Sequence, residues 1–238
     1  EIRLRRISFF LNFFISNLGK VPFYIILEIC YYRELKEEIN TKNNITPILV
    51  ADKIFKDMMM TNEIILKHIL LGVHKIDADV DDIKLNFITQ TLPLFSKYDY
   101  SKTVDILVYF EHQNKRYLTN IELNSSHYNT IKLRNLMYLE RSTSLVLKKG
   151  ENIDVLKNAY VSQINLNIRD TYSIDPGMWK FGNDIMTDTR KIYAIPLAKY
   201  LKRYYNGDSL KNHELIFAML MMEKTEDMRE LIKKVDDK

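Results

Sequence analysis

Two carboxylates stand inside otherwise apolar, strand-like segments of this 238-residue chain. Asp105 lies in residues 104–110, and Glu122 follows seventeen positions later in residues 117–124. An acid in a buried strand is costly unless another group compensates its charge, and a divalent cation with oxygen ligands is one common compensation. The pair is therefore the first candidate for chemistry in the chain.

The two segments alternate apolar and polar residues with the period of two that is typical of β-strands. This alternation places Asp105 away from the more apolar face of its segment, and it puts Glu122 on the same side as Asn124. Polar turn residues at 113–115 join the segments. We therefore predict a β-hairpin across which the two acids converge.

Four short motifs follow one another along the chain: DKIFK at 52–56, VDI at 104–106, IELN at 121–124 and RNLMY at 134–138. Their order and spacing resemble the PD-(D/E)XK nuclease superfamily. Within it they are similar to the Rpn group of recombination-promoting nucleases, also described as putative transposases, which typically show D-x-x-F-K, V-D-I, I-E-x-Q and R-x-x-x-Y. Each motif alone is common, so the ordered set carries the resemblance, which covers residues 45–234.

The resemblance implies an α/β fold with a restriction-endonuclease-like core, in which helices flank a mixed central sheet of four or five strands. A helical C-terminal extension is expected after the core. We accordingly divide the chain into an N-terminal apolar arm and linker at 1–44, a nuclease-like core at 45–170 and a mostly helical extension at 171–238.

The resemblance also implies an activity, the metal-dependent hydrolysis of DNA phosphodiester bonds by an endonuclease linked to recombination or mobile elements. Asp105 and Glu122 would bind Mg²⁺ or Mn²⁺, with the backbone carbonyl of Leu123 as a further ligand. Asn124 would orient the attacking water, and Asp52 would complete the metal shell. DNA is the expected partner, no small-molecule cofactor is implied, and a homodimer is left open.

Basic residues beside an acidic site are what a phosphodiester substrate needs. The expected contacts to DNA are Lys56, Lys132, Arg134 and Tyr138. Two of these cations have alternative interpretations, because Lys56 is spaced to pair with Asp52 on one helix and Arg134 can pair with Glu122 or Asp105. His127, between Glu122 and Arg134, is a candidate proton acceptor because neutral imidazole accepts a proton near pH 7.

One position departs from the pattern of the group. Asn124 stands where the superfamily has Lys and the Rpn group usually has Gln. Asn keeps an amide donor and acceptor, but it cannot bring positive charge to the attacking water. The first alternative is therefore a catalytically inactive nuclease fold that binds DNA or a protein, and the second is a membrane-associated protein in which the acids form structural ion pairs.

Composition limits these interpretations. The formal net charge of +4 and the pI near 8.9 permit contact with nucleic acid without requiring it. Cys30 is the single cysteine, so an internal disulfide is excluded and a cytoplasmic setting is expected. The apolar runs of residues 1–33 are short and interrupted at Gly19 and Pro22, which favours a packed helix or arm over a membrane span.

The remaining segments must position these residues. We predict a helix from residue 47 that is interrupted at 61–62 and resumes at 64–74, and a helix from 125 to 149 that ends at Gly150. Further strands are expected at 80–91, 159–168 and 190–196, followed by a helix at 197–205 and a Met-rich helical segment after residue 209.

Overall fold

The computed structural model describes residues 52–88, 91–92, 102–124, 131–147, 149–168, 179–181, 184–222 and 227. His127 and the whole predicted arm at 1–44 lie outside these residues, as do the side chains of Asp52 and Lys132. All the helices and strands given below belong to one compact unit, Leu49–Met221.

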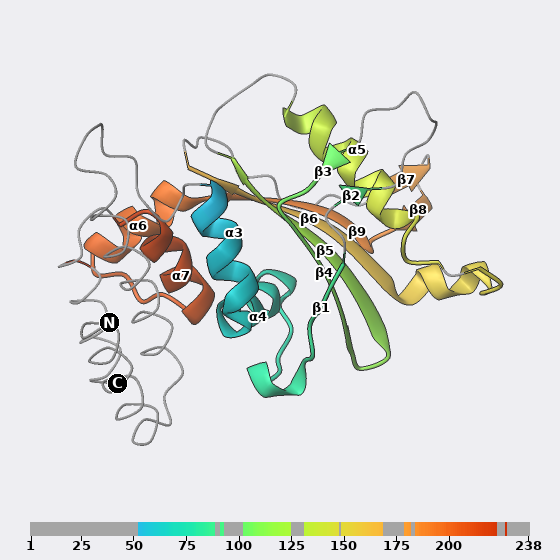
Figure 1. Cartoon of the computed structure of the whole chain (residues 1–238), viewed down its shortest axis with the longest axis horizontal. Coiled ribbons are helices and arrows are strands. Elements are labelled where there is room, and N and C mark those ends of the chain that lie inside the picture. Colours follow the sequence, from blue (N-terminus) through green and yellow to red (C-terminus); the bar gives the residue numbers. More distant parts are fainter. Residues whose placement is uncertain are drawn as a thin grey trace, which may run out of the picture. The chain divides into compact units, whose positions relative to one another are not determined.

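A five-stranded mixed sheet forms the centre of this unit, with the strand order β1-β4-β5-β6-β9 (Figure 1). Its strands are β1 (Asn86–Phe87), β4 (Ile106–His112), β5 (Lys115–Asn124), β6 (Ala159–Asn167) and β9 (Arg190–Pro196). Neighbours from β1 to β5 are antiparallel, whereas β5, β6 and β9 run parallel. The expected α/β class with a mixed sheet is confirmed.

Two short antiparallel strand pairs lie outside the main sheet: β2 (Thr91–Leu92) with β3 (Lys102–Thr103), and β7 (Trp179–Phe181) with β8 (Asp184–Thr187). The predicted β4–β5 hairpin closes at Gln113 and Asn114, which have φ values of 49° and 59°. Two successive positive φ values suit the right-handed twist of a two-residue hairpin, and Asn tolerates this conformation better than most residues.

The helices are α3 (Asp52–Thr61), α4 (Glu63–His74), α5 (Ile131–Thr143), α6 (Leu197–Tyr205) and α7 (Asn212–Leu220), with short 3-10 helices η2 (Val80–Asp82) and η3 (Ile153–Asn158). Asn62 separates α3 from α4 and caps α4, because its side-chain oxygen accepts a hydrogen bond from Ile65 N at 3.3 Å. The predicted interruption at 61–62 is thus confirmed. No helix of the described residues is long and apolar enough to cross a membrane.

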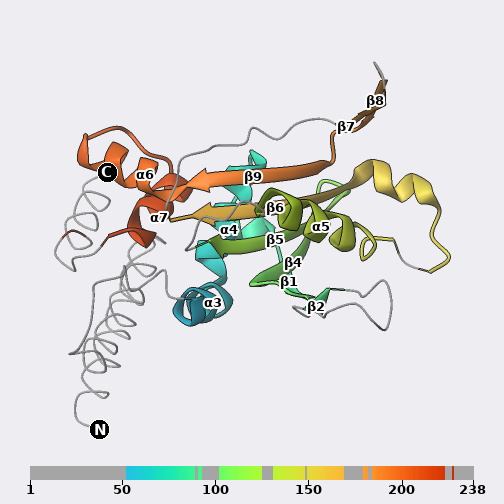
Figure 2. The same cartoon turned by 90° about the horizontal axis from the view of Figure 1, so that it is seen from above.

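Opposite faces of the sheet are covered by different helices (Figure 1, Figure 2). Tyr138 and Leu139 of α5 pack in one cluster with Leu107 and Leu118 of the hairpin. On the other face, the His74 ring of α4 packs against the rings of Phe110, Tyr117 and Tyr193. Side chains at alternate strand positions therefore belong either to the α5 face or to the α4 face.

Two predicted elements differ from the structure. Within the predicted strand at 80–91, the residues from Val80 form η2, because the side chains of Asp79 and Asp82 cap that turn reciprocally. The helix predicted to reach residue 149 ends at Thr143. The hydroxyl of Thr143 donates to the carbonyl of Leu139 at 2.9 Å, and the hydroxyl of Ser144 donates to the carbonyl of Arg141 at 2.7 Å. Such bonds from side chains to the backbone compete with continuation of the helix.

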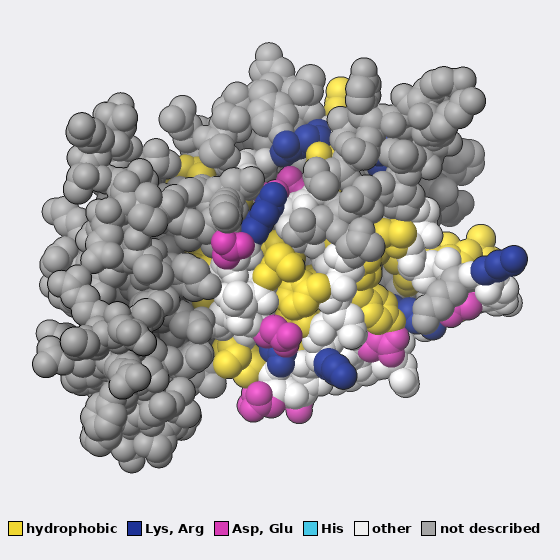
Figure 3. All heavy atoms as spheres, viewed as in Figure 1, with side chains coloured by type: hydrophobic (Ala, Val, Ile, Leu, Met, Phe, Trp, Pro, Cys, Tyr) yellow, Lys and Arg dark blue, Asp and Glu magenta, His cyan; other side chains and the backbone are white. Residues whose placement is uncertain are grey.

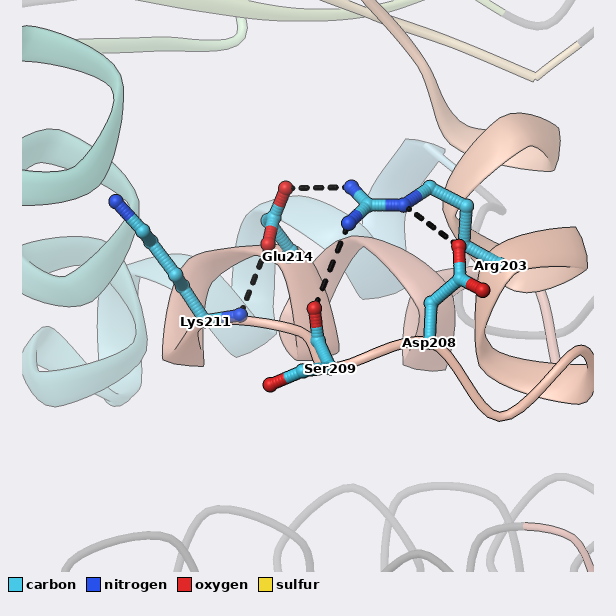
Figure 4. A network of polar contacts seen from close by, with 5 residues as sticks. All are labelled: Arg203, Asp208, Ser209, Lys211 and Glu214. Carbon is cyan, nitrogen blue, oxygen red and sulfur yellow. Dashed lines mark hydrogen bonds and ion pairs between the residues drawn. The ribbon is translucent and has the colours of Figure 1, made fainter.

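Arg203 joins α6 to the start of α7 (Figure 4). Its guanidinium donates to Asp208 at 3.2 Å and to Glu214 at 2.7 Å, and Glu214 also accepts from Lys211 N at 2.9 Å. Partial burial alone would raise the pKa of Glu214, but the hydrogen bonds from the Lys211 backbone and from Arg203 outweigh it and lower the pKa.

Replacing Glu214 by Gln should therefore destabilise the fold by about 1 kcal/mol at pH 7, because the charged acceptor at the start of α7 is lost. A carboxylate with a lowered pKa stabilises the fold above its unfolded pKa, so the difference should shrink as the pH falls through the folded pKa. Urea denaturation of the parent and E214Q measures this. Asp208→Asn, at a more exposed carboxylate, is the control and should cost less; equal losses would contradict the assignment.

Candidate functional site

The hairpin brings Asp105 and Glu122 together, as the alternation predicted. Strand register pairs Ile106 with Ile121, so the next residues outward are neighbours. The backbone N–H of Asp105 donates to Glu122 Oε1 at 3.1 Å, and the backbone N–H of Leu123 donates to Asp105 Oδ2 at 2.9 Å. Each acid is thus fixed by the backbone of the other strand.

Lys56 of α3 supplies positive charge to this pair. Its Nζ lies 3.0 Å from Asp105 Oδ1, and the two side chains are 27% and 13% exposed. One of the residues expected to contact DNA therefore lies against a carboxylate of the site. The half-buried ammonium group compensates the negative charge of Asp105.

Glu122 is the more deeply buried acid, with 5% of its surface exposed. Burial raises its pKa to about 7, and the negative charge of Asp105 adds to the increase. The hydrogen bond from Asp105 N and the positive charge of Arg134 act in the opposite direction. A carboxyl group with this pKa exchanges its proton close to neutral pH, which is the range in which an acid or base acts best.

A row of five buried amide side chains continues from Glu122 across two parallel strands; the amide row comprises Asn120, Asn124, Gln163, Asn165 and Asn167. Its members face one another because the register pairs Asn120 with Gln163 and Asn124 with Asn167, while Asn165 lies opposite Glu122. The contacts include Asn120 Nδ2 to Gln163 Oε1 at 2.6 Å, Gln163 Nε2 to Asn165 Oδ1 at 3.2 Å and Asn124 Nδ2 to Asn167 Oδ1 at 3.0 Å.

The amide row touches the acid pair, because Asn120 Nδ2 also lies 3.4 Å from Glu122 Oε1. Sequence reasoning did not include Gln163, Asn165 and Asn167 in the site. The sequence signal that could have identified them is their alternate spacing in a strand that is otherwise apolar. Amide side chains on one buried face of a strand must form hydrogen bonds with one another.

Asn124 and Arg134 are in direct contact. The guanidinium of Arg134 donates to Asn124 Oδ1, and its Cζ lies 5.7 Å from the centre of the Tyr138 ring. With Nδ2 bonded to Asn167, the amide of Asn124 is held from both ends. Tyr138 is buried in the cluster beneath α5, so its ring supports Arg134.

The other predicted site residues are only partly located. Asp52 opens α3 and Lys132 lies in α5, but their side chains are outside the described residues, and so is His127. On the face shown in Figure 3, the Lys and Arg side chains of the described residues are interspersed with Asp and Glu. A continuous basic surface is not seen on that face of the described part.

The donor set for a metal consists of two carboxylates in the described part of the chain. No group of three or more His, Cys, Asp or Glu side chains there could hold a metal ion. Asp105 and Glu122 nevertheless offer the hard oxygen ligands that Mg²⁺ and Mn²⁺ prefer, and the remaining positions around such ions are commonly filled by carbonyls and water. The residues present thus fit a weakly held divalent cation.

Comparison with protein-family models, with curated proteins and with solved structures gave no match to this chain. The fold and the site define an α/β protein with paired acids on neighbouring antiparallel strands of a mixed sheet. The resemblance to the PD-(D/E)XK superfamily and the Rpn group stays a prediction from motif order.

The raised pKa of Glu122 predicts how stability depends on pH. Between about pH 4.5 and 7 the folded state holds a proton that the unfolded state has released, so stability should fall as the pH rises through this window, by up to about 1.4 kcal/mol per pH unit. Glu122→Gln removes this decline. We expect E122Q to gain about 3 kcal/mol relative to the parent between pH 4.5 and pH 8 in urea denaturation.

The matched control is Glu140→Gln, which changes an exposed acid of α5. E140Q should follow the pH dependence of the parent. Parallel stability curves for the parent and E122Q across this range would show that Glu122 has no raised pKa.

Proposed function

We propose that this chain is a metal-dependent DNA endonuclease with a PD-(D/E)XK-like core, and that Asp105 and Glu122 hold the cation. The observation that carries the proposal is the fixed contact of two acids across β4 and β5, with Lys56 lying 3.0 Å from one of them. The arrangement places two carboxylates side by side, and Lys56 balances the charge of one of them. The motif order supports the same assignment.

A bound Mg²⁺ or Mn²⁺ would lower the pKa of a water molecule and polarise the scissile phosphate. Asp105 and Glu122 would hold it, with the backbone carbonyl of Leu123 and the side chain of Asp52 as further ligands. Lys56 then contacts the phosphate of the substrate, because its ammonium group already lies at the edge of the acid pair.

Asn124 has a smaller role in this proposal than a Lys would have. Its Nδ2 donates to Asn167 and its Oδ1 accepts from Arg134, so one lone pair of Oδ1 is left for a water molecule. Asn124 thereby holds Arg134 at the site, and Arg134 with Lys132 would bind the DNA backbone. A link to recombination or mobile elements would follow from the family resemblance.

The alternative function is a nuclease fold without catalysis that binds DNA or a protein. It is favoured by the engagement of Asn124 at both ends of its amide, because an amide held in this way brings no positive charge to the place of the superfamily Lys. This alternative predicts retardation of DNA, or a protein partner, without cleavage in any divalent metal.

Cleavage of plasmid DNA tests the proposal. The full chain should nick or linearise DNA with Mg²⁺ or Mn²⁺ and lose this activity in EDTA. Asp105→Asn should lower the rate at least about 100-fold, because one of the two charged ligands is removed. Asp154→Asn changes an exposed acid of η3 and should cut like the parent.

An Asp105→Asn variant that cuts at the parent rate would contradict the proposal. If the folded parent retards DNA but cuts in none of these metals, the binding module is the better account.

Lys56→Met separates metal binding from substrate binding. Removing the ammonium group should tighten the binding of Mn²⁺ about threefold or more, because a competing positive charge next to Asp105 is lost. The same substitution should lower cleavage, because the phosphate loses a contact. Titration calorimetry with Mn²⁺ and the plasmid assay give the two readouts, and Lys67→Met on α4 is the control. Weaker Mn²⁺ binding in K56M would contradict the arrangement proposed here.

A further inference from the structure

A cavity of about 230 Å³ lies at the closed end of the β4–β5 hairpin. Lys75 at the end of α4, Lys115 in the hairpin and Lys191 in β9 contribute to its lining, together with tyrosine rings of β5, β6 and β9. Asp105 lies before the start of β4, seven residues along the chain from His112 at the cavity, which corresponds to roughly 20 Å along a strand. Figure 1 shows α3 near the other end of these strands. The cavity is therefore distinct from the acid pair.

Positive charge predominates in this cavity. In the part of the chain that the structure describes, the ion pairs join other side chains, and none includes Lys75, Lys115 or Lys191. Asp77 is the one carboxylate in the lining. Burial, with a further effect of Lys191, lowers the pKa of His74 to about 3, so this ring adds no charge at pH 7. With three lysines and one aspartate, the lining carries a formal net charge of +2 at pH 7.

The wall of the cavity is built from aromatic rings held in place. Tyr117 stacks on Tyr160 with centroids 5.1 Å apart, and Lys115 Nζ lies 5.5 Å from the centre of the Tyr160 ring. His74 packs edge-on against Tyr193 at 5.7 Å, and its Nε2 lies 3.0 Å from the Thr119 hydroxyl. A rigid aromatic wall loses little conformational entropy when a flat ligand packs against it.

The phenol groups add donors to this lining. Burial raises the pKa of Tyr193 to about 12, and it raises the pKa of Tyr117 as well. Both phenols therefore keep their protons at pH 7 and can donate hydrogen bonds to an anion. Ammonium groups, phenol donors and ring faces together suit a ligand that is anionic at one end and flat at the other.

We infer that this cavity binds the phosphate monoester of an aromatic ligand, with Lys75, Lys115 and Lys191 around the phosphate and the tyrosine rings against the aromatic part. A phosphate monoester carries about −1.5 to −2 charges at pH 7, which matches the excess of positive charge in the lining. A nucleoside monophosphate has this chemistry, and so does a phosphorylated end of a nucleic-acid strand. The inference does not depend on the proposed cleavage of DNA.

Titration calorimetry with adenosine 5′-monophosphate and with adenosine tests this inference on the full chain. The monophosphate should bind, and adenosine should bind at least about 10-fold more weakly, because the charged phosphate contacts are absent. Lys191→Met and Lys115→Met should each weaken the binding of the monophosphate at least about 10-fold. The control Lys199→Met, on the exposed side of α6, should bind like the parent.

A second pair of probes distinguishes the two sources of the phosphate, namely a short oligonucleotide with a 5′-phosphate and the same strand with a 5′-hydroxyl. Preference for the 5′-phosphate strand over the monophosphate assigns the cavity to strand ends, and the reverse assigns it to free nucleotides. Both titrations are made in EDTA, in which the proposed metal-dependent cleavage does not occur, so a failure of cleavage does not affect this result.

Circular dichroism and thermal unfolding first confirm that each variant is folded. The inference is overturned if neither phosphorylated probe binds better than its unphosphorylated counterpart. It is equally overturned if folded Lys191→Met and Lys115→Met both bind the monophosphate as tightly as the parent.

Discussion

The site depends on the burial of two carboxylates beside one another where β4 and β5 pair. Asp105 and Glu122 are each held by the backbone of the opposite strand, so neither can turn away from the other. Two neighbouring carboxylates with little exposure to solvent need a compensating positive charge, or one of them must take up a proton. Both responses are present, since Lys56 contacts Asp105 and the pKa of Glu122 is raised to about 7.

Helices and strands around the acid pair supply the side chains that contact it. Helix α3 brings Lys56 to Asp105, and α5 brings Arg134 to Asn124. The parallel pairing of β5 with β6 aligns the amide row, which carries hydrogen bonds from Glu122 to the backbone carbonyl of Tyr193 in β9. Because these hydrogen bonds link β5, β6 and β9, the position of Glu122 depends on the pairing of all three strands.

Local sequence rules predicted the parts of this structure that local chemistry decides. The hairpin follows from alternation and from Gln113–Asn114, and the helix at 197–205 has the bounds that were expected. The contact of Lys56 with Asp105 and the amide row depend on tertiary placement and strand register, which one sequence does not contain. The prediction of a strand from residue 80 was wrong for Val80–Asp82, because capping by Asp79 and Asp82 stabilises a 3-10 helix despite the apolar pattern.

The central claim is that Asp105 and Glu122 together bind a divalent cation, and proton release tests it most directly. With its pKa at about 7, Glu122 is about half protonated at pH 7, and a bound cation must displace that proton. Titration of the full chain with Mn²⁺ in two buffers of different ionisation enthalpy measures the release. The account predicts release of about half a proton per Mn²⁺ at pH 7, almost none at pH 9, and loss of this release in Glu122→Gln. Mn²⁺ binding without proton release at pH 7, or no binding at all by folded protein, would contradict it.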